Sequence, residues 1–199
     1  MTGNLVGAYM ETLQQVVECA SITDKAGEPV PLEKAVRSMG QDMRATNDRG
    51  NQIFFVGNGG SAGICSHMAT DYSKNGCMRA SALNDGAVLT CLGNDYGYEH
   101  VFEKQIEWHA RSGDLLVAIS SSGRSANILN AAKAALACDC TVFTLSGFDA
   151  DNPLRGLGDL NIHLANHEYG FVEVGHLALL HIVLDIQMGW QPAADRGAA

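Results

Sequence analysis

Short, wholly apolar stretches alternate with longer amphipathic stretches along most of this 199-residue sequence. Five apolar stretches predict buried strands: IFFVG (53–57), AVLTCLG (87–93), DLLVAIS (114–120), TVFTLSG (141–147) and NIHLA (161–165). Between and after them, helices are predicted at 61–74, near 99–110, at 125–138 and at about 171–189. Apolar strands separated by helices are typical of a parallel sheet covered on both faces. The predicted fold class is α/β, a doubly wound five-stranded parallel sheet flanked by helices.

Two further helices are predicted before the first strand. Residues 4–22 carry apolar side chains at helical spacing, and a second helix is predicted over 32–48 after a loop with Gly27 and Pro29. The length suits one domain over residues 1–199. Its N-terminal helices would occupy about 1–48 and its α/β core about 51–190.

Composition narrows the class of function. Hydrophobic residues make up 46% of the chain and charged residues 18%, as in ordinary globular proteins. The net charge of −9 and the lack of a basic stripe argue against nucleic-acid binding. No apolar run reaches the roughly 20 residues that span a bilayer, and no secretory leader pattern is present. Six cysteines without a framework spacing indicate reduced thiols. We therefore expect a cytoplasmic protein that binds no membrane.

Two loops at the carboxyl ends of predicted strands are rich in groups that bind anions. Ligands of parallel α/β sheets bind at this edge. The first loop is Gly57-Asn58-Gly59-Gly60-Ser61, whose glycines allow a ligand to approach the backbone closely. The second is Ser120-Ser121-Ser122-Gly123-Arg124-Ser125-Ala126-Asn127. Hydroxyls clustered at the start of a helix favour phosphate binding, although a helix-capping turn explains one or two of the serines.

These two loops, together with Gly93-Asn94-Asp95-Tyr96-Gly97, resemble the sugar isomerase (SIS) domain. More narrowly, nearly the whole chain is similar to the sedoheptulose-7-phosphate isomerases, also called phosphoheptose isomerases. The resemblance implies a homotetramer with active sites between subunits. It implies that Ser120, Ser122 and Ser125 hold the sugar phosphate, helped by Ser121 and Ser61. Asn58, with Gly59 beside it, would touch sugar hydroxyls, and Asp95 would contact substrate near the reacting carbons.

His67 and Asp71 are four residues apart on one predicted helix and so share a face. In the isomerases that the chain resembles, the corresponding helix carries His and Glu, and the last helix carries Gln and His. These groups bind zinc and transfer protons. The resemblance therefore implies one Zn²⁺ per subunit, held by His67, Asp71, Glu173 and His181. Asp71 replaces the family's Glu, and Glu173 replaces its Gln.

Both departures have a chemical meaning. Two imidazoles and two carboxylates are good zinc ligands, whereas Asp71 withdraws its carboxylate by one methylene, about 1.5 Å. We expect Asp71 to act as base and His181 as acid, with Glu173 able to exchange roles with Asp71. At about 100° per residue, His176 is a rival ligand to His181, because it lies closer in direction to Glu173. His181 alone is also compatible with a core histidine.

The predicted activity is that of a phosphosugar aldose–ketose isomerase. The substrate expected from the resemblance is sedoheptulose 7-phosphate, converted through an enediol to a D-glycero-D-manno-heptose 7-phosphate for lipopolysaccharide, capsule or another heptose-containing product. The alternative is a non-catalytic SIS module, such as the replication proteins that associate with the bacterial initiator. The departures at Asp71 and Glu173 keep that alternative open, and the sequence alone does not decide which sugar phosphate is used.

Overall fold

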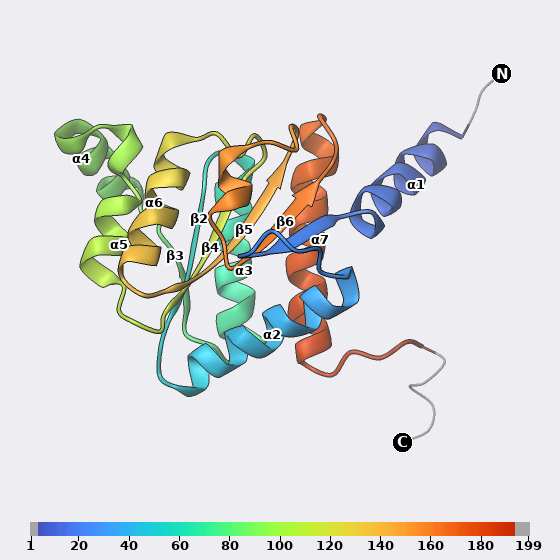
Figure 1. Cartoon of the computed structure of the whole chain (residues 1–199), viewed down its shortest axis with the longest axis horizontal. Coiled ribbons are helices and arrows are strands. Elements are labelled where there is room, and N and C mark those ends of the chain that lie inside the picture. The colour runs from blue at the N-terminus through green and yellow to red at the C-terminus, as the bar shows by residue number, and fades with distance from the viewer. Residues whose placement is uncertain (1–3, 194–199) are drawn as a thin grey trace.

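A six-stranded sheet forms the middle of the computed structural model, which describes residues 4–193 (Figure 1). The strands are β1 (Ser21–Asp24), β2 (Ile53–Gly57), β3 (Ala80–Ala82), β4 (Leu115–Ser120), β5 (Thr141–Gly147) and β6 (Leu160–Leu164). Their order across the sheet is β1-β6-β5-β4-β2-β3. Strands β2 to β6 run parallel, and β1 pairs antiparallel with β6 at one edge. The α/β class is therefore confirmed, and the five predicted parallel strands become six with one antiparallel edge.

Helices cover both faces of this sheet. They are α1 (Leu5–Glu18), α2 (Leu32–Asp48), α3 (Gly60–Lys74), α4 (Gly86–Tyr96), α5 (Glu103–His109), α6 (Ala126–Ala137) and α7 (Tyr169–Gln187). Two 3₁₀ turns, η1 (Tyr98–His100) and η2 (Pro153–Gly156), join them. Helix α1 extends away from the sheet (Figure 1), contacts α7 and has no buried residue.

Alternate residues of the central strands supply two separate hydrophobic cores. Phe55 packs with α2, α3 and α7 on one face, whereas its neighbours Phe54 and Val56 pack with α4, α5 and α6 on the other. In β4, Val117 faces the first core and Leu116 the second. This period of two explains why the strands are apolar throughout, as expected for a parallel sheet buried on both sides.

The predicted strand at 87–93 is wrong, because this segment lies within helix α4. The side chain of Asp85 accepts a hydrogen bond from the amide of Val88 (2.9 Å) and so caps the helix. Val88, Leu89 and Leu92 follow helical spacing and pack on the second core. The apolar run therefore marks one face of a helix, and the parallel strand of this region is the short, weakly patterned β3.

The first predicted helix is also too long at its end. Helix α1 ends at Glu18, and the chain then forms edge strand β1, in which Ile22 is 3% exposed and pairs with Ile162. The β-branched pair Ile22-Thr23 suits a strand better than a helix end. The helix predicted over 32–48 is confirmed as α2.

Among the described residues, α7 is the one helix whose length and composition would suffice to cross a membrane (mean hydropathy 1.4). Its contacts give a different reason for this composition. It packs against α1, α2, α3 and the sheet, and Leu179, Leu180, Val183 and Leu184 are buried there. Helix α7 is thus a core helix that packs beside α3.

Candidate active site

The serine-rich turn after β4 closes on itself through its own hydroxyls. The Oγ atoms of Ser120 and Ser125 are 3.2 Å apart, and the Gly123 amide donates to Ser120 Oγ (3.2 Å). Gly123 has a φ of +61°, a conformation that favours glycine. Helix α6 begins directly after Ser125, so its first amide groups lie beside the hydroxyls. Such a turn offers several short donors to one anion.

The glycine loop after β2 lies beside the serine turn. Gly59 has a φ of +54° and turns the chain into α3, which begins at Gly60. A Cβ on Gly57 would lie 2.8 Å from backbone atoms of Ser61, so the strand and the first turn of α3 approach each other closely. Glycine is required at both positions for these reasons.

Both loops line one cavity of about 340 Å³ at the carboxyl ends of β2 and β4. Its walls are Asn58, Gly59, Gly60, Ser61, Ile119, Ser120, Ser121, Ser122, Ser125, Tyr169 and Glu173. The structure therefore brings seven of the eight predicted substrate-binding residues to one cavity. The eighth, Asp95, lies exposed on α4, where it contacts Asn94 and Cys91 and does not line this cavity.

Asn58 is held in place by two residues that the sequence prediction did not select. Its amide exchanges two hydrogen bonds with the Asn127 amide, each 2.9 Å long. Tyr98 donates a third from its hydroxyl to Asn58 Oδ1 (3.1 Å). Asn127 is 3% exposed and comes at the end of the serine motif, which was the available signal for its role. No comparable signal marks Tyr98.

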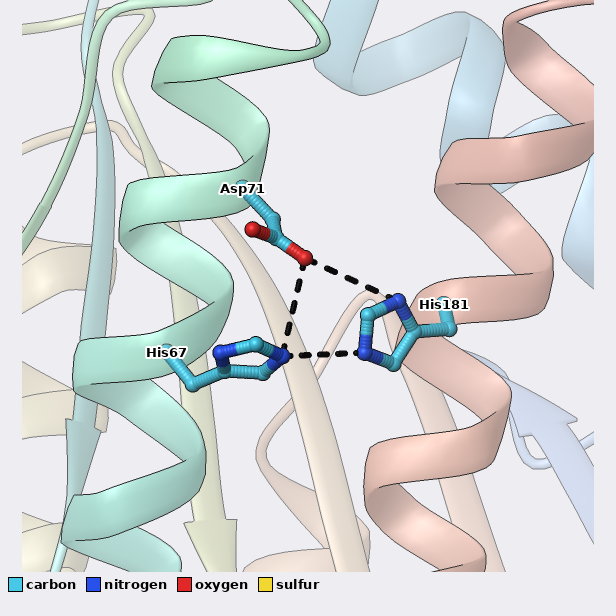
Figure 2. A group of neighbouring side chains, drawn as sticks. All are labelled: His67, Asp71 and His181. Carbon is cyan, nitrogen blue, oxygen red and sulfur yellow. Dashed lines mark hydrogen bonds and ion pairs between the residues drawn. The ribbon is translucent and has the colours of Figure 1, made fainter.

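His67, Asp71 and His181 converge from α3 and α7, as Figure 2 shows. The Nε2 atoms of the two imidazoles are 3.1 Å apart. Asp71 Oδ2 lies 3.5 Å from His67 Nε2 and 3.8 Å from His181 Nδ1. The side chain of His67 is 52% exposed, whereas that of Asp71 is 20% exposed. The cluster is therefore accessible from solvent and has a partly buried carboxylate behind it.

The donors of this cluster fit a zinc ion. One ligand atom from each of the three residues lies within 4.8 Å of the others. Two imidazole nitrogens and one carboxylate oxygen are a common catalytic zinc set, in which three protein ligands leave a position for water or substrate. The fourth predicted ligand, Glu173, is not part of the cluster.

Glu173 instead lies in the serine cavity, two helical turns before His181. Its carboxylate lies against Gly60, where an added Cβ would clash with both carboxylate oxygens. The rival ligand His176 is fully buried and donates from Nε2 to the Ser146 carbonyl (3.0 Å). The structure thus assigns His181, and not His176, to the cluster with His67.

The sequence and the fold agree on the class of this protein. The SIS domain family matches residues 9–147, so the chain belongs to the SIS domain family. Within it, the chain is 32% identical over 185 residues to the phosphoheptose isomerase of Aliarcobacter butzleri, covering 90% of this chain and 91% of that protein. It is 35% identical over 193 residues to the phosphoheptose isomerase of Shewanella loihica, covering 93% of each.

A solved structure is similar over the same extent. The phosphoheptose isomerase of Neisseria gonorrhoeae superposes with a TM-score of 0.80 at 29% identity, covering 96% of this chain and 100% of that one. The resemblance deduced from three short motifs is therefore confirmed over nearly the full length.

Proposed function

We propose that this protein is a sugar-phosphate isomerase that interconverts sedoheptulose 7-phosphate and D-glycero-D-manno-heptose 7-phosphate. Its relatives over nine-tenths of the chain are phosphoheptose isomerases. The observation that carries the proposal is the pairing of a serine-lined cavity with a His/Asp/His cluster along the same two helices, α3 and α7. Phosphate binding and proton transfer are the two requirements of this reaction.

The serine turn would bind the phosphate. Ser120, Ser122 and Ser125 supply hydroxyls at the start of α6, and Ser121 and Ser61 lie on the same cavity wall. The positive end of the helix dipole favours the anion at this point. Asn58, fixed by Asn127, would contact a sugar hydroxyl.

The distance between the serine cavity and the His/Asp/His cluster suits a long substrate. Seven residues of α3 separate Gly60 in the cavity from His67, and eight residues of α7 separate Glu173 from His181. At 1.5 Å per residue these stretches span about 10–12 Å. This is comparable with the length of an extended seven-carbon sugar phosphate, so the carbonyl end would reach the cluster when the phosphate is in the serine turn.

The chain's own carboxylates and imidazoles would move the protons. Asp71 would accept the proton from the carbon beside the carbonyl, and His181, 3.8 Å from it, would exchange protons with the substrate oxygens. His67, Asp71 and His181 would hold Zn²⁺, which when bound stabilises negative charge on the enediol oxygens. Glu173 is the alternative base, because it lines the cavity on the same helix as His181.

We also propose a cytoplasmic homotetramer with active sites between subunits. The apolar residues Leu5, Val6, Tyr9 and Met10 of α1 are exposed in the single chain, which supports burial of this helix against other copies. A site shared between copies would explain why Asp95 lies outside the cavity of its own chain. Light scattering should give a mass near four times the 21.1 kDa of one chain, whereas a monomer would contradict the proposal.

The test is isomerisation of sedoheptulose 7-phosphate by the wild type and by Asp71→Asn and Glu173→Gln, with zinc content measured in each. We expect kcat to fall by about 10²–10⁴-fold in the variant that has lost the base. The other variant should keep more activity, and the comparison shows whether Asp71 or Glu173 is the base. Turnover unchanged in both variants, with no metal bound to any of them, would reject the proposal.

The same assay decides against or in favour of a non-catalytic module. An interaction module would bind sugar phosphate or a protein partner and isomerise none of a panel of phosphosugars. The intact His67, Asp71 and His181 cluster favours the enzyme.

A further inference from the structure

A second cavity, of about 460 Å³, lies at the opposite end of the sheet from the serine turn. Its walls come from the residues that precede the strands: Gln52 before β2, Arg79 before β3 and Asp114 before β4. These loops meet below the sheet in Figure 1, near the end of α2. Nothing in the proposed isomerase reaction uses this cavity.

The charge of the cavity is opposite to that of the chain. Arg49, Arg79 and Arg111 line it, together with His109, although the chain as a whole has a net charge of −9. In the described part of the chain, none of the three guanidinium groups lies within ion-pair distance of a carboxylate. Arg37 and Arg124, by contrast, pair with acidic side chains. Arg49 donates from Nη2 to the Thr46 hydroxyl (3.4 Å) and Arg79 from Nη1 to the Gly50 carbonyl, and their other N–H groups remain as donors for an anion.

The one carboxylate in the wall, Asp114, is already satisfied by amide donors. Its Oδ1 accepts from the Asn51 side chain (2.9 Å) and the Gln52 backbone (2.8 Å), and its Oδ2 accepts from the Arg111 backbone (2.8 Å). Asp114 is 4% exposed. It fixes two loops relative to each other and so shapes the cavity, and its one negative charge is outnumbered by the three arginines in the same wall.

Neutral groups complete a site of the kind that binds metabolites. Gln52 donates from Nε2 to the Ser81 hydroxyl (2.8 Å), which leaves the amide oxygen and the hydroxyl proton available. Phe54 and Leu83 add apolar surface. The cavity is mainly polar, and its volume lies within the range of small-molecule sites.

We propose that this cavity binds a small metabolite with at least two negative charges on phosphate or carboxylate groups. The planar guanidinium group presents paired N–H donors that match two oxygens of either anion. Arg49, Arg79 and Arg111 approach the cavity from three different loops, so they surround the ligand. The site is separate from the serine turn, which lies at the other end of β2.

The test is titration calorimetry of the full-length protein with inorganic pyrophosphate and, separately, with citrate. The Arg49→Gln/Arg111→Gln variant should bind the preferred anion at least tenfold more weakly than the wild type. Arg37→Gln, which removes one positive charge from α2 outside the cavity, should bind as the wild type does. The preference between pyrophosphate and citrate identifies phosphate or carboxylate as the ligand group.

Location is tested independently by soaking crystals of the wild type with tungstate and recording its anomalous signal. A peak among the three arginines supports the proposal even if the double variant folds poorly. Equal binding by the wild type and the double variant overturns it. So do an equal loss in Arg37→Gln and the lack of any tungstate peak in the cavity. None of these outcomes depends on isomerase activity.

Discussion

The reciprocal hydrogen bonds between Asn58 and Asn127 show how a residue beside the site can orient one within it. Each amide uses one donor and one acceptor on the other, and Tyr98 adds a third bond to Asn58. The orientation of the Asn58 amide is therefore fixed before substrate arrives, which lowers the entropy lost on binding. Asn127 is buried and contacts Asn58, so we expect it to act as a positioning residue.

Replacing Asn127 by Ala should raise KM about tenfold and change kcat little, because two hydrogen bonds to Asn58 are lost while the proton-transfer groups are untouched. Steady-state kinetics with sedoheptulose 7-phosphate measures both constants. Asn130→Ala is the matched control, since Asn130 lies on the same helix and contacts the Glu99 carbonyl. A fall in kcat with unchanged KM would argue against the positioning role.

For single residues, the sequence indicated which side chains could bind a ligand better than it indicated where each side chain lies in the fold. Spacing on α3 was enough to put His67 and Asp71 on one face. Helical periodicity did not separate His176 from His181, because it gives directions on a helix and not what each direction faces. The position of Glu173 depends on how closely α7 passes Gly60, which is a property of tertiary packing.

The serine turn packs against the start of η2, where Asn152 is the capping residue. The buried Asn152 side chain accepts from the Arg155 amide and donates to the Ser146 hydroxyl and the Asp149 carbonyl. It also lies directly against Gly123, where an added Cβ would clash with its Oδ1. The turn therefore has no room for a side chain at this glycine.

Gly123→Ala should lower the free energy of unfolding by about 2 kcal/mol and weaken phosphate binding, because both the positive φ and the contact with Asn152 oppose a Cβ. Gly156→Ala is the control in the supporting turn, where a Cβ would meet nothing within 4 Å. Urea unfolding and phosphate titration compare the two. Equal stability of the two variants would show that the turn is not constrained as described.

Helices and strands with the longest and most regular hydrophobic patterns were predicted best. Helices α2, α3 and α6 and strands β2, β4 and β5 lie within a few residues of their predicted bounds. The run at 87–93 was assigned to a strand because an apolar stretch of seven residues has no clear period. The capping side chain of Asp85 decides for a helix there. Strand β3 is only three residues long, so its sequence carries almost no pattern.

For the molecule as a whole, a buried histidine couples stability to pH. His176 is fully buried, its Nδ1 has no hydrogen-bond partner in the described part of the chain, and burial lowers its pKa from 6.5 to about 4. The pKa of the nearby His163 is lowered as well, chiefly by burial. The folded protein therefore keeps His176 neutral at a pH where the unfolded chain binds a proton.

Stability should fall by about 2 kcal/mol as the pH drops from 6.5 to 5, because unfolding then takes up a proton on His176. Well above pH 6.5 this contribution no longer changes, and below pH 5 the stability continues to fall until the pH reaches the folded-state pKa near 4. Urea unfolding at a series of pH values measures the slope. His176→Gln should flatten it, and an unchanged slope in this variant would assign the effect to other groups.

The proposed reaction is proton transfer on a sugar phosphate held between the serine turn and the cluster of His67, Asp71 and His181. Turnover of sedoheptulose 7-phosphate in deuterated water, followed by NMR, tests this most directly. Because the Asp71 carboxylate that would take up the carbon proton is partly exposed to solvent, an enediol reaction predicts heptose 7-phosphate product that carries deuterium at the reacting carbon. Substrate that binds to the protein with neither isomerisation nor deuterium incorporation would contradict the account.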